Sequence, residues 1–269
     1  MMNEARFEIT DLDLSQAQTL GFSWLSSQPA KKTFSVKELA HLILLYLEKE
    51  DMEKSTSLLT FLLSLQNQDG SFGNLRDTAR AGSLLFTIAA KKISLPPFVF
   101  QAGNETLSVE AIKTAANNSL LCLMSQKERW DEDIYDVVYI LSALGDAGVF
   151  EPAFCLNLCV QDAPERQHPG TTALIITALQ KQKNLSQFSA SENDVVSEFI
   201  QQKTAWLISV QEKDGLKYPA TGNLVLHALI LCGEKKQALK SLFWLLRSQN
   251  ENGSWENDIN TTALSLLTL

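Results

Sequence analysis

The sequence predicts an all-α fold built from helical hairpins, and two observations support this prediction. The first is a unit that occurs twice, as FLLSLQNQDGSFG at 61–73 and as WLLRSQNENGSW at 244–255. In both copies an apolar helical segment leads through a glutamine into an Asp-Gly or Asn-Gly turn, where glycine accepts a positive φ. The second is that a glutamine follows an apolar segment at six places: Gln28, Gln66, Gln126, Gln161, Gln211 and Gln249. Each unit therefore predicts a helix, a turn and a second helix, as in helical-repeat proteins.

The first helix of each hairpin is predicted from apolar spacing. In the segment 55–66, Leu58, Leu62 and Leu65 recur at the i, i+4 and i+7 positions of one helical face. The segment 236–249 has the same spacing. The six predicted first helices are 14–28, 55–66, 109–126, 152–161, 195–211 and 236–249.

The second helix of each hairpin is predicted from the apolar segment that follows the turn. Ser35, with Glu38 three residues later, matches a capping box, and Asp77 is the kind of residue that favours a helix start. The six second helices are expected to begin near Val36, Asp77, Asp133, Gly170, Ala220 and Ile259, and the third to cover 130–144. Six hairpins suggest a closed ring, although an open superhelix would give the same pattern.

The chain as a whole is predicted to consist of an N-terminal arm and one domain, and the domain contains one irregular segment. Residues 1–13 are polar and predict a loose N-terminal arm, and residues 14–269 predict a single domain. The segment 93–106 contains two prolines, which exclude a helix. It is expected to be a loop on the outer wall or a flap over the mouth of the ring.

Composition narrows the class of protein. The chain has 269 residues, a net charge of −8 and a pI of about 5.0. This balance argues against nucleic acid or an anionic membrane as a partner, because both require a basic surface. No apolar run reaches the length of a membrane span, and the N-terminus lacks the apolar core of a signal peptide. We therefore expect a soluble, cytoplasmic protein with no membrane span.

Cysteine and histidine give no metal signature. The four cysteines form no C-x-x-C pair and lie in apolar helical segments, which favours reduced packing residues. His41 and His227 lie within predicted helices, where a hydrogen-bonded core histidine is the common role. His168 precedes a Pro-Gly turn and is a candidate for the rim of a cavity.

The two turn units, Gln…Asp-Gly-Ser-Phe and Gln…Asn-Gly-Ser-Trp, resemble the QW-type repeats of the squalene cyclase and protein prenyltransferase superfamily. The resemblance spans roughly residues 22–269 and is strongest at 61–92 and 244–269. It implies an (α/α)6 toroid, with six inner helices around a central cavity and six helices outside. It also implies a hydrophobic small-molecule ligand, such as an isoprenoid, in that cavity.

The same resemblance implies candidate catalytic residues. Class II terpene cyclases of this superfamily protonate an alkene with the middle aspartate of a D-x-D-D motif. The stretch most similar to it is Asp131-Glu132-Asp133-Ile134, which lacks the fourth aspartate. Asp136 lies one helical turn beyond Asp133, and two close carboxylates can share one proton. The catalytic candidates are therefore Asp131, Asp133 and Asp136. The alternative is that Asp131 and Asp133 cap a helix.

Further residues are candidates for substrate binding. Arg80 lies one turn beyond Asp77, where it is either a structural ion-pair partner or a ligand for an anionic head group. Tyr135, Tyr139 and Tyr218 are candidates for an aromatic lining that stabilises a carbocation, or they are ordinary core residues. With the rim residue His168, the candidate substrate-binding set is Asp77, Arg80, Tyr135, Tyr139, His168 and Tyr218.

A zinc-dependent activity is not expected. Prenyltransferases of this superfamily hold zinc with an Asp-x-Cys pair and a later histidine, and no cysteine here has an aspartate two residues before it. Thr261 stands where that histidine is expected. We therefore expect no cofactor, except Mg2+ if the substrate is a diphosphate. The sequence thus predicts a class II terpene cyclase-like protein that acts on an isoprenoid or polyene.

The alternative function is a non-catalytic toroid that binds a hydrophobic ligand or a protein partner. A second subunit or domain also belongs among the predicted partners. The reason is that cyclases of this superfamily place the active site between two such domains, and this chain has the length of one.

Overall fold

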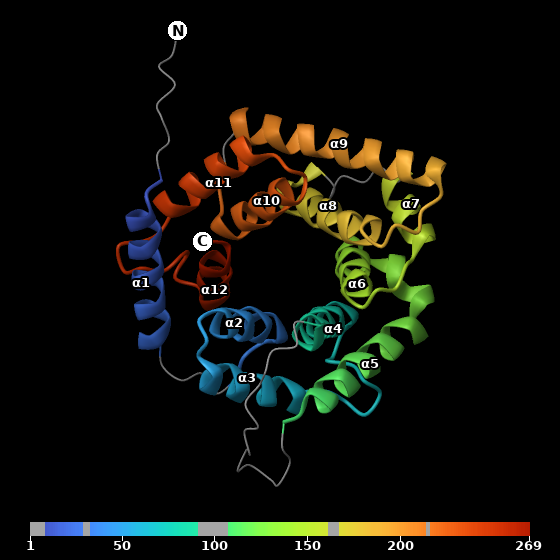
Figure 1. The fold of residues 1–269 in the computed structure, drawn as a ribbon, viewed down its shortest axis with the longest axis horizontal. Helices are drawn as coiled ribbons and strands as arrows, with labels where there is room; N and C mark the ends of the chain where they lie inside the picture. Colours follow the sequence, from blue (N-terminus) through green and yellow to red (C-terminus); the bar gives the residue numbers. More distant parts are fainter. Residues whose placement is uncertain (1–8, 29–32, 91–106, 161–166, 214–215) are drawn as a thin grey trace. The chain divides into compact units, whose positions relative to one another are not determined.

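The computed structural model describes residues 9–28, 33–90, 107–160, 167–213 and 216–269. About 77% of these residues lie in helices, and none of them lies in a strand (Figure 1). The predicted all-α class is therefore confirmed for the described part of the chain. No helix in these ranges is both long enough and apolar enough to cross a membrane.

The helices follow the predicted order of hairpins. The first six elements are α1 (Asp11–Ser27), α2 (Val36–Glu48), α3 (Met52–Ser64), α4 (Leu75–Ala90), α5 (Val109–Ser125) and the 3-10 helix η1 (Lys127–Glu132). They are followed by α6 (Ile134–Asp146), α7 (Pro152–Val160), α8 (Pro169–Lys183), α9 (Ala190–Lys213), α10 (Pro219–Leu231), α11 (Lys235–Arg247) and α12 (Ile259–Thr268). The predicted loop or flap at 93–106 lies outside the described residues.

The first helix begins three residues earlier than the predicted Leu14. Thr10 caps α1 by accepting a hydrogen bond from the backbone N–H of Asp13, and the Asp13 carboxylate accepts from the N–H of Thr10 at 2.9 Å. This reciprocal capping box fixes the start of the helix at Asp11. Residues 11–13 of the predicted arm are therefore helical, while residues 1–8 are outside the described part.

The predicted third inner helix, 130–144, is interrupted at its start. Residues 127–132 form the short helix η1 instead, and the buried Trp130 donates its indole N–H to the carbonyl of Leu123 at 2.9 Å. Asp133 then adopts an extended conformation and caps α6, which begins at Ile134. The anchored indole and the cap together stop one helix and start the next.

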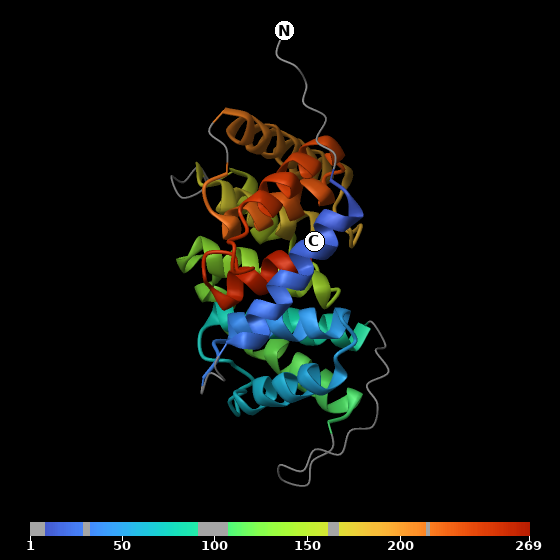
Figure 2. The same ribbon diagram turned by 90° about the vertical axis from the view of Figure 1, so that its left-hand side faces the viewer.

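Contacts between helices divide the chain into two compact units. Unit 1 consists of Met1–Thr33, Pro164–Ala173 and Gln202–Leu269, and in it α12 packs against both α1 and α10. Within unit 1, α11 also packs against α10 and α1. Figure 2 shows α1 lying along α12, so the first and last helices of the chain are neighbours.

Unit 2 consists of Phe34–Ala163 and Leu174–Gln201. In it α2 packs against α3 and α4, and α4 packs against α5 and α6. Its apolar core includes Leu39, Ile43, Leu59, Leu62, Phe72, Leu84, Leu85, Ile88 and Ile112. The prediction of a single domain for residues 14–269 stays a prediction.

The two turn units have the same hydrogen bonds, which explains their shared residues. The asparagine after the glutamine donates its N–H to the serine carbonyl, at 2.8 Å for both Asn67–Ser71 and Asn250–Ser254. The glycines of the two turns, Gly70 and Gly253, have φ values of 86° and 90°. Glycine adopts this left-handed conformation without the steric strain that a side chain would cause.

The repeated glutamine joins neighbouring hairpins at three of its five described positions. In each turn unit its side-chain amide donates to the turn glycine and to a backbone carbonyl of another first helix. The acceptors are Gly70 (3.1 Å) and Ala115 (2.9 Å) for Gln66, and Gly253 (2.8 Å) and Ala17 (2.9 Å) for Gln249. The amide of Gln211 likewise reaches α11, where it donates to Ser241 Oγ at 2.6 Å. We call Gln66, Gln211 and Gln249 the glutamine brackets.

The remaining glutamines of the predicted repeat do not form brackets. The amide of Gln28 donates to the carbonyl of Trp24 within the same helix end, and that of Gln126 lies 3.4 Å from Cys122 Sγ. Gln161 lies outside the described residues. The glutamine at a helix end is therefore a repeat marker, but its role depends on which helix lies beside it.

Candidate functional site

The nine predicted site residues fall into two separate groups. Seven lie in unit 2, near the beginnings of α4 and α6: Asp77, Arg80, Asp131, Asp133, Tyr135, Asp136 and Tyr139. The other two, His168 and Tyr218, lie in unit 1, just before α8 and α10. Each group is therefore described within its own unit.

Asp133 is engaged at both carboxylate oxygens. Oδ1 accepts a hydrogen bond from the backbone N–H of Tyr135 at 2.7 Å, which caps α6. Oδ2 accepts from Nη2 of Arg76 at 2.8 Å. The same guanidinium donates through Nε to Asp136 Oδ1 at 3.0 Å. Arg76, on α4, therefore lies between the two carboxylates that the sequence singled out on α6.

The surroundings of Arg76 favour its charged form. Burial of the guanidinium alone would lower its pKa, but the negative charges of Asp136 and Asp133 and their hydrogen bonds outweigh burial and raise that pKa. Both carboxylates thus face a permanent positive charge. The guanidinium of Arg76 thus bridges Asp133 and Asp136 through one hydrogen bond to each carboxylate. Asp131 is exposed in η1.

The other unit 2 candidates are also partners of arginines. Arg80 Nη1 donates to Asp77 Oδ1 at 2.9 Å, so this pair has the structural arrangement that the sequence left open. The guanidinium of Arg80 lies 4.1 Å from the ring centre of Tyr139, and that of Arg76 lies 5.2 Å from the ring centre of Tyr135. Both tyrosine rings therefore stack with an arginine.

A second polar cluster, around Asp146, lies further along α4 than Arg76 and Arg80. Asp146 Oδ2 accepts a hydrogen bond from Ser83 Oγ at 2.5 Å and from Lys181 Nζ at 2.6 Å. We call the whole set the polar seam, and it consists of Arg76, Asp77, Arg80, Ser83, Asp133, Tyr135, Asp136, Tyr139, Asp146 and Lys181. Three cationic groups face four carboxylates in this seam, so it is nearly neutral and favours neither an anionic nor a strongly apolar ligand.

The unit 1 candidates share a groove. It has a volume of about 660 Å3 and is lined by Gln167, His168, Pro169, Trp206, Ser209, Val210, Leu216, Lys217, Tyr218 and Thr221. Tyr218 is 60% exposed, and the ring of His168 lies over Gly170, where a Cβ atom would be 3.2 Å from His168 Cε1. No described carboxylate lines the groove. Its mixture of aromatic, aliphatic and hydrogen-bonding groups is typical of small-molecule sites.

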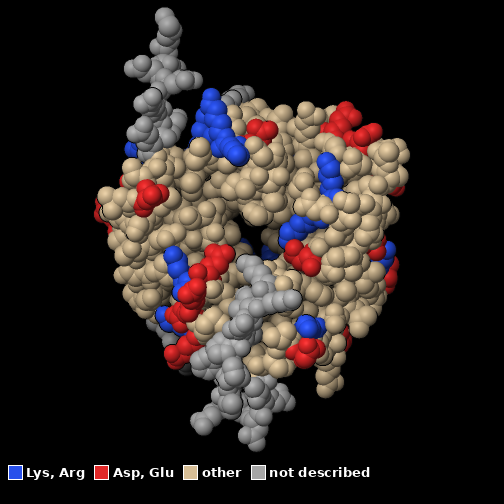
Figure 3. Space-filling view, viewed as in Figure 1, with Lys and Arg blue, Asp and Glu red and all other residues tan. Residues whose placement is uncertain are grey.

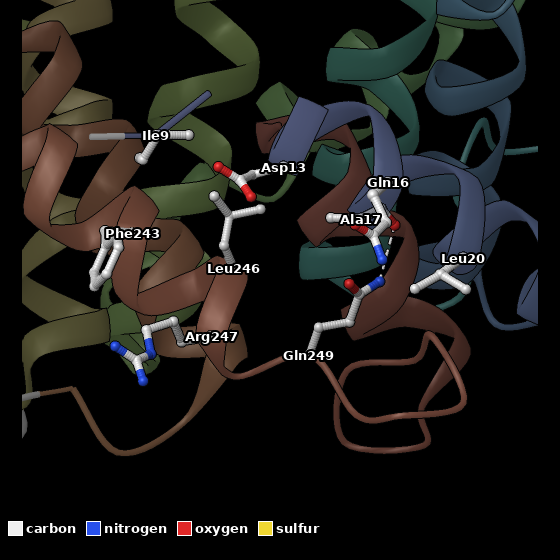
Figure 4. A pocket seen from close by; sticks show the side chains of 9 residues that line it. All are labelled: Ile9, Asp13, Gln16, Ala17, Leu20, Phe243, Leu246, Arg247 and Gln249. Carbon is white, nitrogen blue, oxygen red and sulfur yellow. Dashed lines mark hydrogen bonds between the residues drawn. The ribbon is translucent and has the colours of Figure 1, made fainter. Parts of the chain in front are cut away.

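A smaller groove of about 440 Å3 lies between α1 and α11 (Figure 4). Its lining consists of Ile9, Asp13, Gln16, Ala17, Leu20, Phe243, Leu246, Arg247 and Gln249. The guanidinium of Arg247 lies 5.5 Å from the ring centre of Phe243, and the bracket from Gln249 to Ala17 joins the two sides of the groove. The groove therefore marks the joint between the two helices.

The described residues contain no group of three or more His, Cys, Asp or Glu side chains that could hold a metal ion. On the face shown in Figure 3, the basic side chains of the described residues are interspersed with acidic ones. The sequence did not single out Arg76 or Lys217. The helical period offered a signal for Arg76, which lies four residues before Arg80, whereas nothing local marked Lys217.

No protein-family model matches this chain, and no curated protein sequence or solved structure is significantly similar to it. Assignment of function therefore depends on the geometry of the sites themselves.

Proposed function

We propose that this chain is a non-catalytic (α/α)6 toroid that acts in the cytoplasm and binds a hydrophobic small molecule with a polar end. The observation that supports this choice is the arrangement at Asp133. One of its oxygens caps α6 and the other accepts from Arg76, so each oxygen has a partner that joins or starts a helix. This favours a structural role for the acidic motif, and ligand binding is the function that we propose instead.

Two patterns support the toroid. The second helix of a hairpin packs against the first helix of the next hairpin in the pairs α2–α3, α4–α5, α6–α7 and α10–α11. The contact of α12 with α1 continues this rule from the last hairpin to the first. The Gln249 bracket to Ala17 repeats the Gln66 bracket to Ala115 in the same way. Both patterns are those of a repeat array that returns to its start.

The groove in unit 1 is the proposed ligand site. Trp206, Val210 and Leu216 offer apolar surface, while His168 and Lys217 offer donors for a polar end. A volume of about 660 Å3 is within the range of cavities that hold small organic ligands.

Native mass spectrometry and a binding titration with farnesol test this proposal. We expect farnesol to bind the purified chain, and Trp206→Ala to weaken binding about tenfold because an aromatic anchor is lost. Leu239→Ala is the matched control, since Leu239 is an exposed apolar residue that does not line the groove. Equal affinity of wild type and Trp206→Ala would place the ligand elsewhere, and no binding of any hydrophobic probe would overturn the proposal.

An acid-initiated cyclase acting on an isoprenoid or polyene is the second candidate function. The observation in its favour is that Arg76 hydrogen-bonds to both Asp133 and Asp136 and that its guanidinium lies 5.2 Å from the ring centre of Tyr135. Incubation with squalene, farnesyl diphosphate and geranylgeranyl diphosphate, with and without Mg2+, distinguishes the two functions. A cyclised product that disappears in Asp133→Asn, with the fold intact, would establish the cyclase. Absence of product together with farnesol binding is the result that we expect.

A further inference from the structure

The groove of unit 1 has an apolar wall that comes mainly from α9. Trp206 and Val210 both line the groove and lie one helical turn apart in α9, so they share one face of that helix. Leu216, which is 8% exposed, adds a buried aliphatic side chain from the segment before α10. The wall therefore offers apolar surface to the body of a ligand.

Hydrogen-bond donors reach the same groove from two other segments of the chain. His168 directly precedes α8, and Lys217 and Tyr218 directly precede α10. All three side chains are exposed and carry N–H or O–H donors. The apolar wall and these donors thus come from different elements, which suits a ligand with an apolar body and one polar end.

The charge of the groove lining comes from Lys217. It is the one lysine or arginine among the described residues that line the groove, and none of those residues is an aspartate or glutamate. A lysine ammonium is a compact point charge, so a single lysine balances a single negative charge. A ligand with one carboxylate matches this lining, whereas a diphosphate would bring more negative charge than Lys217 balances.

The helix starts beside the groove add to the preference for an anion that Lys217 sets. The N-terminal end of an α-helix carries a partial positive charge and free backbone N–H groups. Neither α8 nor α10 has an acidic residue in its first turn, and the N-cap residue Tyr218 makes no side-chain capping bond. By contrast, Asp133 and Asp258 cap α6 and α12 with a carboxylate. The positive ends of α8 and α10 are therefore not offset by a carboxylate of their own first turns.

We infer that the polar end of the ligand is a carboxylate, so that the groove binds an apolar carboxylic acid in its ionised form more tightly than the neutral alcohol of the same chain. The inference rests on the proposed ligand site and adds the chemical class of the ligand. Lys217 pairs with the carboxylate, His168 and Tyr218 donate hydrogen bonds to it, and Trp206 packs against the apolar chain. Lys217 is the residue that determines specificity, because its ammonium meets the charge that distinguishes acid from alcohol.

Farnesoic acid and farnesol test this inference, because they have the same apolar chain and differ at the polar end. Binding titrations of the full chain are made at about pH 7.5, where the acid is ionised. We expect the wild type to bind the acid about tenfold more tightly than the alcohol. Lys217→Met should reduce this preference to less than about twofold, and Lys217→Arg should retain most of it because the charge is kept.

The matched control is Lys236→Met, which removes the same charge from an exposed position on α11 that does not line the groove. We expect this variant to keep the preference of the wild type for the acid. Equal affinity of the wild type for acid and alcohol would overturn the inference and leave the proposed ligand site standing. A preference that survives in Lys217→Met would overturn the role of Lys217.

A second measurement uses the unmodified chain, so it does not depend on how the variants fold. Farnesyl diphosphate has the same apolar chain with a more highly charged end, and it separates a carboxylate from a phosphate as the preferred anion. We expect the diphosphate to bind no more tightly than farnesoic acid, because one lysine balances one negative charge. Tighter binding of the diphosphate would overturn the assignment of a carboxylate. Failure of acid, alcohol and diphosphate alike to bind would instead overturn the proposed function, and this inference with it.

Discussion

Arg76 and Asp133 join α4 to α6 through a hydrogen bond of 2.8 Å between guanidinium and carboxylate. The partners are 57 residues apart in the sequence. Because the same guanidinium also donates to Asp136, one side chain of α4 hydrogen-bonds to both carboxylates of α6. Both Asp133 and Asp136 therefore take part in the contact between α6 and α4.

Replacement of Arg76 by methionine is expected to destabilise the protein by about 1 kcal/mol, because Asp133 and Asp136 would then face each other without a cation. Urea unfolding followed by circular dichroism measures this change. Arg129→Met is the control. The Arg129 side chain is 53% exposed and its Nε lies 3.5 Å from Glu132 Oε1, so this ion pair is expected to contribute almost nothing to stability. Equal losses in the free energy of unfolding for the two substitutions would show that the Arg76 bridge contributes no more to stability than an exposed ion pair.

The turn glycines provide a test of the close approach between hairpins. Gly70 and Gly73 both have positive φ, of 86° and 98°, but a Cβ on Gly70 would lie 2.3 Å from the carbonyl oxygen of Asn118, while one on Gly73 would meet nothing within 4 Å. We expect Gly73→Ala to cost about 1–2 kcal/mol from backbone strain alone. Gly70→Ala should cost at least about 2 kcal/mol more, because the neighbouring backbone must move. Similar midpoints in thermal unfolding would contradict this geometry.

The glutamine bracket predicts a stability difference between two glutamines of the repeat. The Gln66 amide donates to Gly70, Ala115 and Ser119, so Gln66→Glu would remove these donors and place a carboxylate against carbonyl oxygens. We expect a loss of about 2–3 kcal/mol in the free energy of unfolding. Gln28→Glu changes a side chain whose bonds stay within its own helix end, and it should cost less than about 1 kcal/mol. Comparable losses, measured by urea unfolding, would argue against the bracket.

Cys155 predicts a dependence of stability on alkaline pH. Burial, followed by the nearby Cys159 and Glu151, raises the pKa of the Cys155 thiol from 9.0 to about 12. The unfolded chain releases this proton at lower pH than the folded chain does. The contribution of the thiol to stability is therefore complete below about pH 9 and is lost as the pH rises toward 12. Denaturant titrations of wild type and Cys155→Ala across this range measure it. The slope of stability against pH should be shallower in the variant.

Local patterns in the sequence were sufficient to predict the helical hairpins. The spacing of Leu58, Leu62 and Leu65 and the Gly70 turn depend only on residues close together in the chain, so α3 and α4 were found within a few residues. Errors arose where a cap or an anchored side chain decided a boundary. Thr10 started α1 early, and Trp130 with Asp133 delayed α6.

The sequence predicted which residues are candidates for the site, but it did not predict how they contact one another. The sequence alone determined that Asp133 stands at a helix start and that Asp136 lies one turn further, because both follow from the helical period. Only the tertiary structure decided that Arg76 occupies the space between them, and that α1 docks against α11 and α12. These relationships join residues that are far apart in the chain, and their free energy comes from packing and charge contacts that exist only once the helices have assembled.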